Sequence, residues 1–120
     1  MPNKARIFYV EDDGASLKMG TSYLKTCGHK VIETASSRAE ALEKIPNLGK
    51  KRINVAIVDG NLSPMGEGIG DGEKIASAIK AQCPNIVVIG HALIAVLTVA
   101  DLNCPKTRGV EELERTIRTA

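Results

Sequence analysis

The stretch NVAIVDGNLSP, residues 54–64, decides how the rest of the chain is interpreted. Its apolar run, residues 55–58, ends at a carboxylate, Asp59, and turn-forming residues follow. A short β-branched run bounded by turn residues is typical of a buried strand in a parallel sheet. Asp59 then lies at the carboxyl end of that strand, which is the edge where ligands bind in open α/β sheets. The pattern makes Asp59 a candidate nucleophile.

A second acid-bearing strand is predicted near the amino terminus. The apolar residues of Arg6–Val10 are followed directly by Glu11, Asp12 and Asp13. Asp13 or Ser16 can cap the helix predicted to follow, because short polar side chains accept hydrogen bonds from the first N–H groups of a helix. A cap explains one acid of the three. The other two either favour the helix dipole or belong to a site.

Strand and helix patterns alternate along the chain, which predicts an α/β fold with a doubly wound parallel sheet. Five strands are predicted, at Arg6–Val10, 31–34, 55–58, 86–89 and Leu102–Pro105. Residues 92–101 fit either a short helix followed by a strand or one continuous strand, because periodicity does not separate short apolar runs. The flavodoxin-like order 2-1-3-4-5 makes the first and third strands neighbours. That order brings the acids of both strands together.

The acids of these two strands predict a metal site. Glu11, Asp12 and Asp59 would lie together at the carboxyl edge of the sheet. Three carboxylates in a small volume repel one another unless a cation lies between them. Carboxylate oxygens suit a hard divalent cation, and Mg²⁺ is our expectation.

Length and composition fit one domain over residues 1–120. With 120 residues, 43% of them hydrophobic, the chain can bury a core without disulfides. The three cysteines, Cys27, Cys83 and Cys104, are far apart and lack metal-binding spacing, so we expect free thiols in a reducing cytoplasm. No apolar stretch is long enough for a signal peptide or a membrane span. We therefore expect a cytoplasmic protein that does not enter a membrane.

The charge pattern does not favour direct binding of nucleic acid. The net charge of +2 comes from mixed signs. The basic triplet at residues 50–52 lies in a polar connection between predicted elements, where such triplets are usually solvated.

The two histidines receive different predictions. His29 follows Gly28 and is predicted to be a turn residue. His91 lies at the carboxyl edge of the predicted sheet, where it is either a general base or a hydrogen-bonded loop residue.

Over nearly its whole length the sequence resembles the receiver domain of two-component response regulators, the CheY-like family. The resemblance depends on an acidic pair, an aspartate at the end of a strand, and a later lysine. The motifs are YVEDD (9–13), AIVDGNLSP (56–64), DGEKIASAI (71–79), VVIGHA (87–92) and ADLNCPKTRGVEEL (100–113).

The resemblance implies a role for each matching residue. Asp59 would be the phosphoacceptor, and Lys106 would pair with the phosphoryl oxygens. Asp12 would bind Mg²⁺ directly, Glu11 largely through water, and Asn61 through its backbone carbonyl. The donor would be a phosphohistidine on a sensor histidine kinase or phosphotransfer protein, or a small phosphodonor. The chain would then be a regulatory phosphoacceptor rather than an enzyme, with self-catalysed phosphorylation at most, and a homodimer is allowed.

The sequence also departs from the receiver pattern. Receivers carry Ser or Thr at the end of strand 4, where this chain has Gly90, followed by His91. They usually carry an aromatic residue three positions before the lysine, where this chain has Asn103. The segment from Gly90 to Lys106 is shorter than usual by about one and a half helical turns. Helix 4 of the receiver pattern is therefore expected to be shortened or absent.

Two functions stay open on these residues. The first is a phosphorylatable receiver with an altered conformational readout, favoured by Glu11, Asp12, Asp59 and Lys106. The second is a receiver-like protein-interaction module that works without phosphorylation, favoured by the departures. A phosphatase of the haloacid-dehalogenase type fits poorly, because it needs a second Asp two residues from the first.

Overall fold

The sheet has the strand order that the sequence predicts. The computed structural model describes residues 4–59, 71–92, 100–105 and 109–119. In these ranges five parallel strands form one sheet in the order β2-β1-β3-β4-β5. The strands are β1 (Arg6–Val10), β2 (Lys30–Ala35), β3 (Val55–Asp59), β4 (Val87–Ala92) and β5 (Leu102–Pro105). The flavodoxin-like α/β prediction is confirmed.

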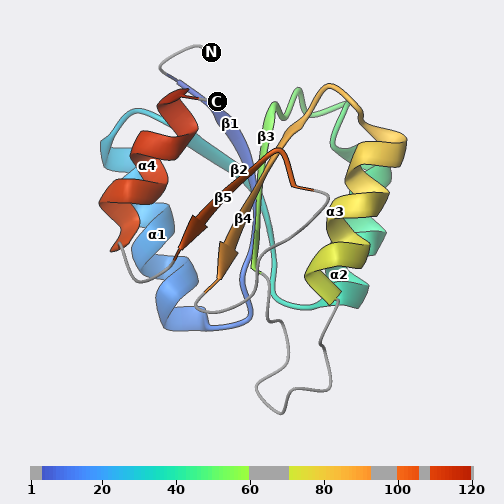
Figure 1. The fold of residues 1–120 in the computed structure, drawn as a ribbon, viewed down its shortest axis with the longest axis horizontal. Helices are drawn as coiled ribbons and strands as arrows, with labels where there is room; N and C mark the ends of the chain where they lie inside the picture. Colours follow the sequence, from blue (N-terminus) through green and yellow to red (C-terminus); the bar gives the residue numbers. More distant parts are fainter. Residues whose placement is uncertain (1–3, 60–70, 93–99, 106–108, 120) are drawn as a thin grey trace.

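Helices cover both faces of the sheet (Figure 1). One face carries α1 (Gly14–Thr26) and α4 (Gly109–Thr119), and the other carries α2 (Arg38–Lys44) and α3 (Asp71–Gln82). A short 3-10 helix, η1 (Ile45–Asn47), continues α2. Because successive strand residues point to opposite faces, β1 places Ile7 and Tyr9 in the core under α1 and α4. Phe8 and Val10 pack into the other core.

The first helix begins at the cap that the sequence suggested. The carboxylate of Asp13 accepts a hydrogen bond from the backbone N–H of Ala15 at 3.3 Å and another from the Ser16 hydroxyl at 2.6 Å. Asp13, not Ser16, is therefore the N-cap residue. The cap accounts for Asp13 and leaves Glu11 and Asp12 for another role.

Asp101, the residue before β5, anchors the start of this strand by polar contacts with β4 and α3. Asp101 accepts hydrogen bonds from the Val88 backbone N–H at 2.8 Å and from Lys80 Nζ at 2.9 Å. The predicted shortening of the receiver helix 4 falls on residues 93–99, which lie outside the described residues. The helix labelled α4 here is the last one in the chain and follows β5.

His29 is not the simple turn residue that the sequence predicted. It is buried, and its Nδ1 accepts a hydrogen bond from the Ala5 backbone N–H at 2.9 Å. Its Nε2 lies 2.9 Å from Oε2 of Glu114 in α4. The partner is 85 positions away in the sequence, so no local pattern indicates the contact.

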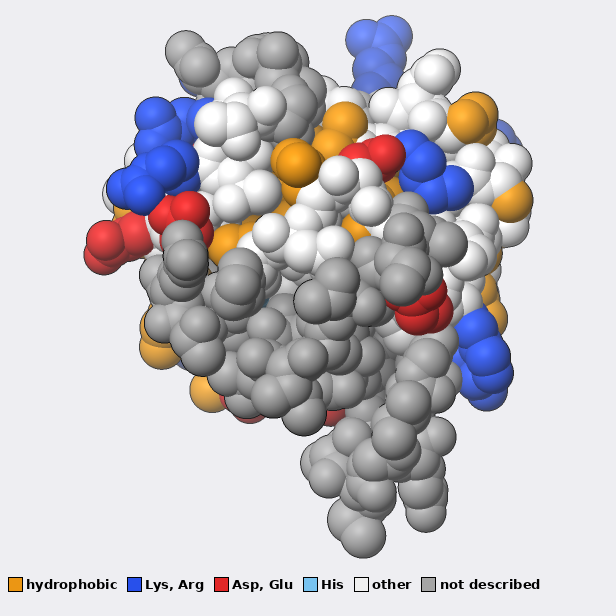
Figure 2. Space-filling view, in the orientation of Figure 1, with side chains coloured by type: hydrophobic (Ala, Val, Ile, Leu, Met, Phe, Trp, Pro, Cys, Tyr) orange, Lys and Arg blue, Asp and Glu red, His pale blue; other side chains and the backbone are white. Residues whose placement is uncertain are grey.

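The mixed surface charge and the absence of disulfides agree with what the composition predicts. Acidic and basic side chains lie next to one another on the face shown in Figure 2. None of the three cysteines forms a disulfide. No helix within the described ranges combines the length and the apolar character needed to cross a membrane.

Candidate functional site

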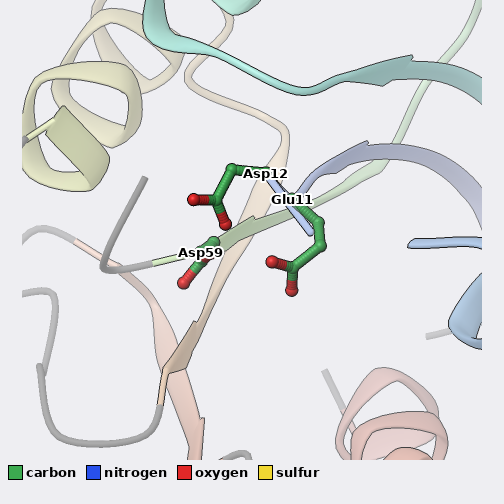
Figure 3. Close-up of side chains that lie close together, drawn as sticks. All are labelled: Glu11, Asp12 and Asp59. Carbon is green, nitrogen blue, oxygen red and sulfur yellow. The ribbon is translucent and has the colours of Figure 1, made fainter. Parts of the chain in front are cut away.

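Three carboxylates converge at the carboxyl edge of the sheet (Figure 3). The strands β1 and β3 are in parallel register, with Val10 opposite Val58, so the residues that follow them lie side by side. Glu11, Asp12 and Asp59 each offer an oxygen, and these oxygens lie within 4.8 Å of one another. The structure thus brings together the three acids that the sequence singled out.

The acids differ in exposure and are supported by the backbone. Glu11 is 1% exposed and Asp59 is 2% exposed, whereas Asp12 is partly exposed. The Glu11 N–H donates to the Ala35 carbonyl at 3.0 Å, which continues the pairing of β1 with β2 beyond the last strand residue. The Glu11 carboxylate also accepts from the Asp13 N–H at 3.3 Å. These contacts hold the turn between β1 and α1 in place.

Tyr9 lines the pocket beside the acids and was not singled out as a site residue from the sequence. It precedes Glu11 by two residues and therefore points to the same face of the sheet. Burial, and then the negative charges of Glu11 and Asp59, raise the pKa of the Tyr9 hydroxyl well above its usual range. The hydroxyl therefore stays protonated near neutral pH. Strand alternation counted back from Glu11 is the signal that would have identified it.

His91 is the residue of β4 that lies beside Asp59. The register pairs Asp59 with His91 and Val58 with Gly90. The fourth strand, expected over residues 86–89 and ending at Gly90 and His91, is observed at Val87–Ala92, so both residues lie within β4. His91 is 6% exposed and belongs to the strand, so it is not the loop residue considered above.

A pocket of about 380 Å³ opens beside the acids on the α1 and α4 side of the sheet. Glu11, Tyr9 and His91 line it from the sheet. Met19 of α1 and Val110 of α4 contribute apolar surface. The pocket gives Glu11, Tyr9 and His91 a shared open volume at the carboxyl edge of the sheet.

The acid cluster fits a hard divalent cation. Two buried carboxylates beside a third repel one another in a medium that screens charge poorly. Carboxylate oxygens are the ligands that Mg²⁺ prefers, and Glu11, Asp12 and Asp59 supply them from fixed strand ends. Asn61 and Lys106, the other two predicted site residues, lie outside the described residues.

Comparison with known proteins identifies the fold. No protein-family model matches this sequence, and no curated protein matches it. Among solved structures, it is similar to a CheY-like response regulator receiver domain protein from Methanospirillum hungatei, with 26% identity and a TM-score of 0.79, over 96% of this chain and 91% of that one. The signal receiver domain of a modulated diguanylate cyclase from Desulfovibrio desulfuricans has 24% identity and a TM-score of 0.71, over 97% and 92%.

A longer protein contains the same fold. The response regulator PhyR from Brucella abortus has 19% identity and a TM-score of 0.77, over 98% of this chain and 47% of that protein. At these identities the likeness to PhyR and to the cyclase domain concerns the fold.

Proposed function

We propose that this chain, whose fold is that of a response regulator receiver domain, accepts a phosphoryl group on Asp59 as part of a two-component signalling system. The donor would be a phosphohistidine on a sensor histidine kinase or phosphotransfer protein. Residues 1–120 would form a single receiver domain. The observation that supports this proposal is the convergence of Glu11, Asp12 and Asp59, with oxygens within 4.8 Å at the carboxyl edge of the sheet.

Asp59 would act as the nucleophile. A carboxylate oxygen of Asp59 would attack the phosphorus atom in line with the leaving group. The bond from oxygen to phosphorus forms as the bond from phosphorus to the donor imidazole breaks, and the imidazole leaves as the neutral ring with a proton from solvent. The product is an acyl phosphate on Asp59. Its position at the end of β3 places the carboxylate at the carboxyl edge of the sheet, beside Glu11 and Asp12.

The remaining acids would hold the metal. Glu11 and Asp12 lie on the β1 side of Asp59, and the Asn61 carbonyl is proposed as a further ligand. Bound Mg²⁺ would supply positive charge for the phosphoryl oxygens. Lys106, which directly follows β5, is proposed to pair with the same oxygens.

The burial of the acids favours a functional role over a purely structural one. Buried carboxylates that converge need compensating positive charge, which a bound cation would supply. Asp13, in the same acidic run, is exposed and caps α1, which is what a structural acid does. Glu11 and Asp59 are instead turned into the sheet edge and are almost completely buried.

Labelling with acetyl phosphate tests the proposal. Intact-mass measurement should show one added phosphoryl group in the presence of Mg²⁺ and none in the presence of excess EDTA. Asp59→Asn should abolish the label, and Asp12→Asn should reduce it strongly. The matched control is Asp13→Asn, which changes the same charge nearby and keeps a side chain that caps helices well.

The control variant should be labelled like the original protein. Label that persists in Asp59→Asn would contradict the assignment. No label under any condition, with acetyl phosphate or a phosphohistidine donor, would instead favour a receiver-like interaction module that works without phosphorylation.

A further inference from the structure

We infer that His91 is a positioning residue for the phosphoryl group on Asp59, to which its imidazole N–H donates a hydrogen bond. This inference rests on the function proposed above. The inference depends on the register of the sheet, which pairs His91 of β4 with Asp59 of β3.

The register places the two side chains next to each other. Asp59 and His91 are paired residues of the neighbouring parallel strands β3 and β4. Neighbouring strands lie about 4.8 Å apart, and paired residues project to the same face. The pair two positions earlier, Ile57 and Ile89, packs in a single core cluster under α1 and α4, which is consistent with the shared face. His91 therefore lies alongside the group that would carry the phosphoryl.

The surroundings fix the histidine in that position. His91 is 6% exposed, and on its other side it is paired with Cys104 of β5. It lines the same pocket as Glu11 and Tyr9, so its ring faces the volume beside the acids. A buried side chain between two strands loses little further freedom when it binds a ligand.

The chemistry of the ring suits the contact. An imidazole carries at least one N–H group in each of its protonation states, so it can donate to a phosphoryl oxygen. Hydrogen bonds to charged oxygens are stronger than those between neutral groups. The donor would reach the phosphoryl from the β4 side, whereas Glu11 and Asp12 lie on the β1 side.

The second histidine provides an internal control. The chain has two histidines. His29 precedes β2 at the opposite end of the sheet, with hydrogen bonds to Ala5 and Glu114. A probe of histidine rings thus reports two separate places, and one of them is distant from Asp59.

The test uses NMR of the full chain with histidine labelled at the ring Cε1 carbon. The probe is Mg²⁺ with beryllofluoride, which mimics a phosphoryl group on a carboxylate. We expect the His91 signal to shift on saturation and the His29 signal to stay in place.

His91→Leu assigns the signals. The apparent Kd for beryllofluoride in this variant should rise about tenfold, because one charge-assisted hydrogen bond is lost. His91→Gln keeps an N–H donor and should recover most of that loss.

The outcomes separate this inference from the proposed function. Beryllofluoride binding with an unchanged His91 signal would overturn the inference and leave phosphorylation of Asp59 standing. An unchanged Kd in a folded His91→Leu variant would overturn it as well. If that variant does not fold, the shift of the His91 signal in the unaltered protein on addition of beryllofluoride decides between the outcomes. Failure of the unaltered protein to bind beryllofluoride or to take up label would contradict both.

Discussion

His29 and Glu114 connect the amino-terminal edge of the sheet to the last helix through a buried contact of 2.9 Å between Nε2 and Oε2. Because Nδ1 of His29 accepts the Ala5 N–H, the ring hydrogen lies on Nε2, which donates to the Glu114 carboxylate. The other oxygen of Glu114 accepts from Arg118 Nε at 2.8 Å. The contact fixes α4, whose first turn lines the pocket beside Asp59.

The first prediction concerns the energy of this contact. Glu114→Ala should lower the free energy of unfolding by about 1 to 3 kcal/mol, because the buried N–H of His29 loses its acceptor. Glu112→Ala is the matched control, since Glu112 lies in the same helix and pairs with Arg115 at the surface. Its effect should stay below about 1 kcal/mol. Equal losses in urea unfolding of the two variants would contradict the role of the buried contact.

The second prediction is a pH dependence. Burial raises the pKa of the Glu114 carboxyl, but hydrogen bonds from His29 and Arg118 outweigh it and hold the pKa below the ordinary value of 4.5. A carboxyl with a lowered pKa in the folded state contributes stability above its unfolded pKa and loses it as the pH falls through the folded value. The stability difference between the original protein and Glu114→Gln should therefore shrink below about pH 4.5. Urea unfolding across this range measures it, and a difference that grows on acidification would contradict the assignment.

The third prediction concerns the close packing of Gly20 against Tyr9. A Cβ atom at Gly20 of α1 would lie 2.5 Å from the hydroxyl oxygen of Tyr9, so the buried Tyr9 ring or the helix would have to shift. Overpacking costs about 1 to 3 kcal/mol, which equals or exceeds the gain of about 1 kcal/mol from replacing Gly by Ala within a helix.

Gly20→Ala should therefore destabilise the protein. Gly14→Ala, in the same helix, meets no atom within 4 Å and should be neutral or slightly stabilising. Thermal unfolding of both variants decides the point. A higher melting temperature for Gly20→Ala would contradict the prediction and would mean that the Tyr9 side chain moves to accommodate the added methyl group.

The fourth prediction concerns repulsion among the acids. Without divalent cations, Asp59→Asn should unfold at a higher temperature than the original protein, because one of three converging negative charges is removed. At Mg²⁺ about ten times above its Kd, the original protein should gain about 1.4 kcal/mol, or about 5 °C in melting temperature. The Asp59→Asn variant should gain much less. An equal effect of Mg²⁺ on both proteins would place the ion elsewhere.

The sequence predicted the architecture because each strand carries its own signal. The strand β3 is an apolar run with a carboxylate at its end, and the structure has it at Val55–Asp59. The requirement that Asp59 lie near Glu11 and Asp12 selected the strand order. These three acids were predictable because buried strands rarely end in charged groups without a reason.

The sequence did not reveal contacts that depend on tertiary structure. The partner of His29 is on the last helix, and Tyr9 resembles any apolar strand residue until its neighbours are known. The fourth strand was expected to end at Gly90 and His91, because these two residues follow the apolar run at residues 86–89. Because β4 pairs with both β3 and β5, the strand extends to Ala92 and His91 lies beside Asp59.

The most direct test of the central claim is to locate the phosphoryl group in the chain. Borohydride reduces an aspartyl phosphate to homoserine, and mass spectrometry of the resulting peptides identifies the residue that was modified. After treatment with acetyl phosphate and Mg²⁺, we predict that homoserine appears at position 59, and that it is absent when Mg²⁺ is omitted. Homoserine at Asp12 or another acid, or its absence from a sample whose intact mass shows the phosphoryl group, would contradict the account.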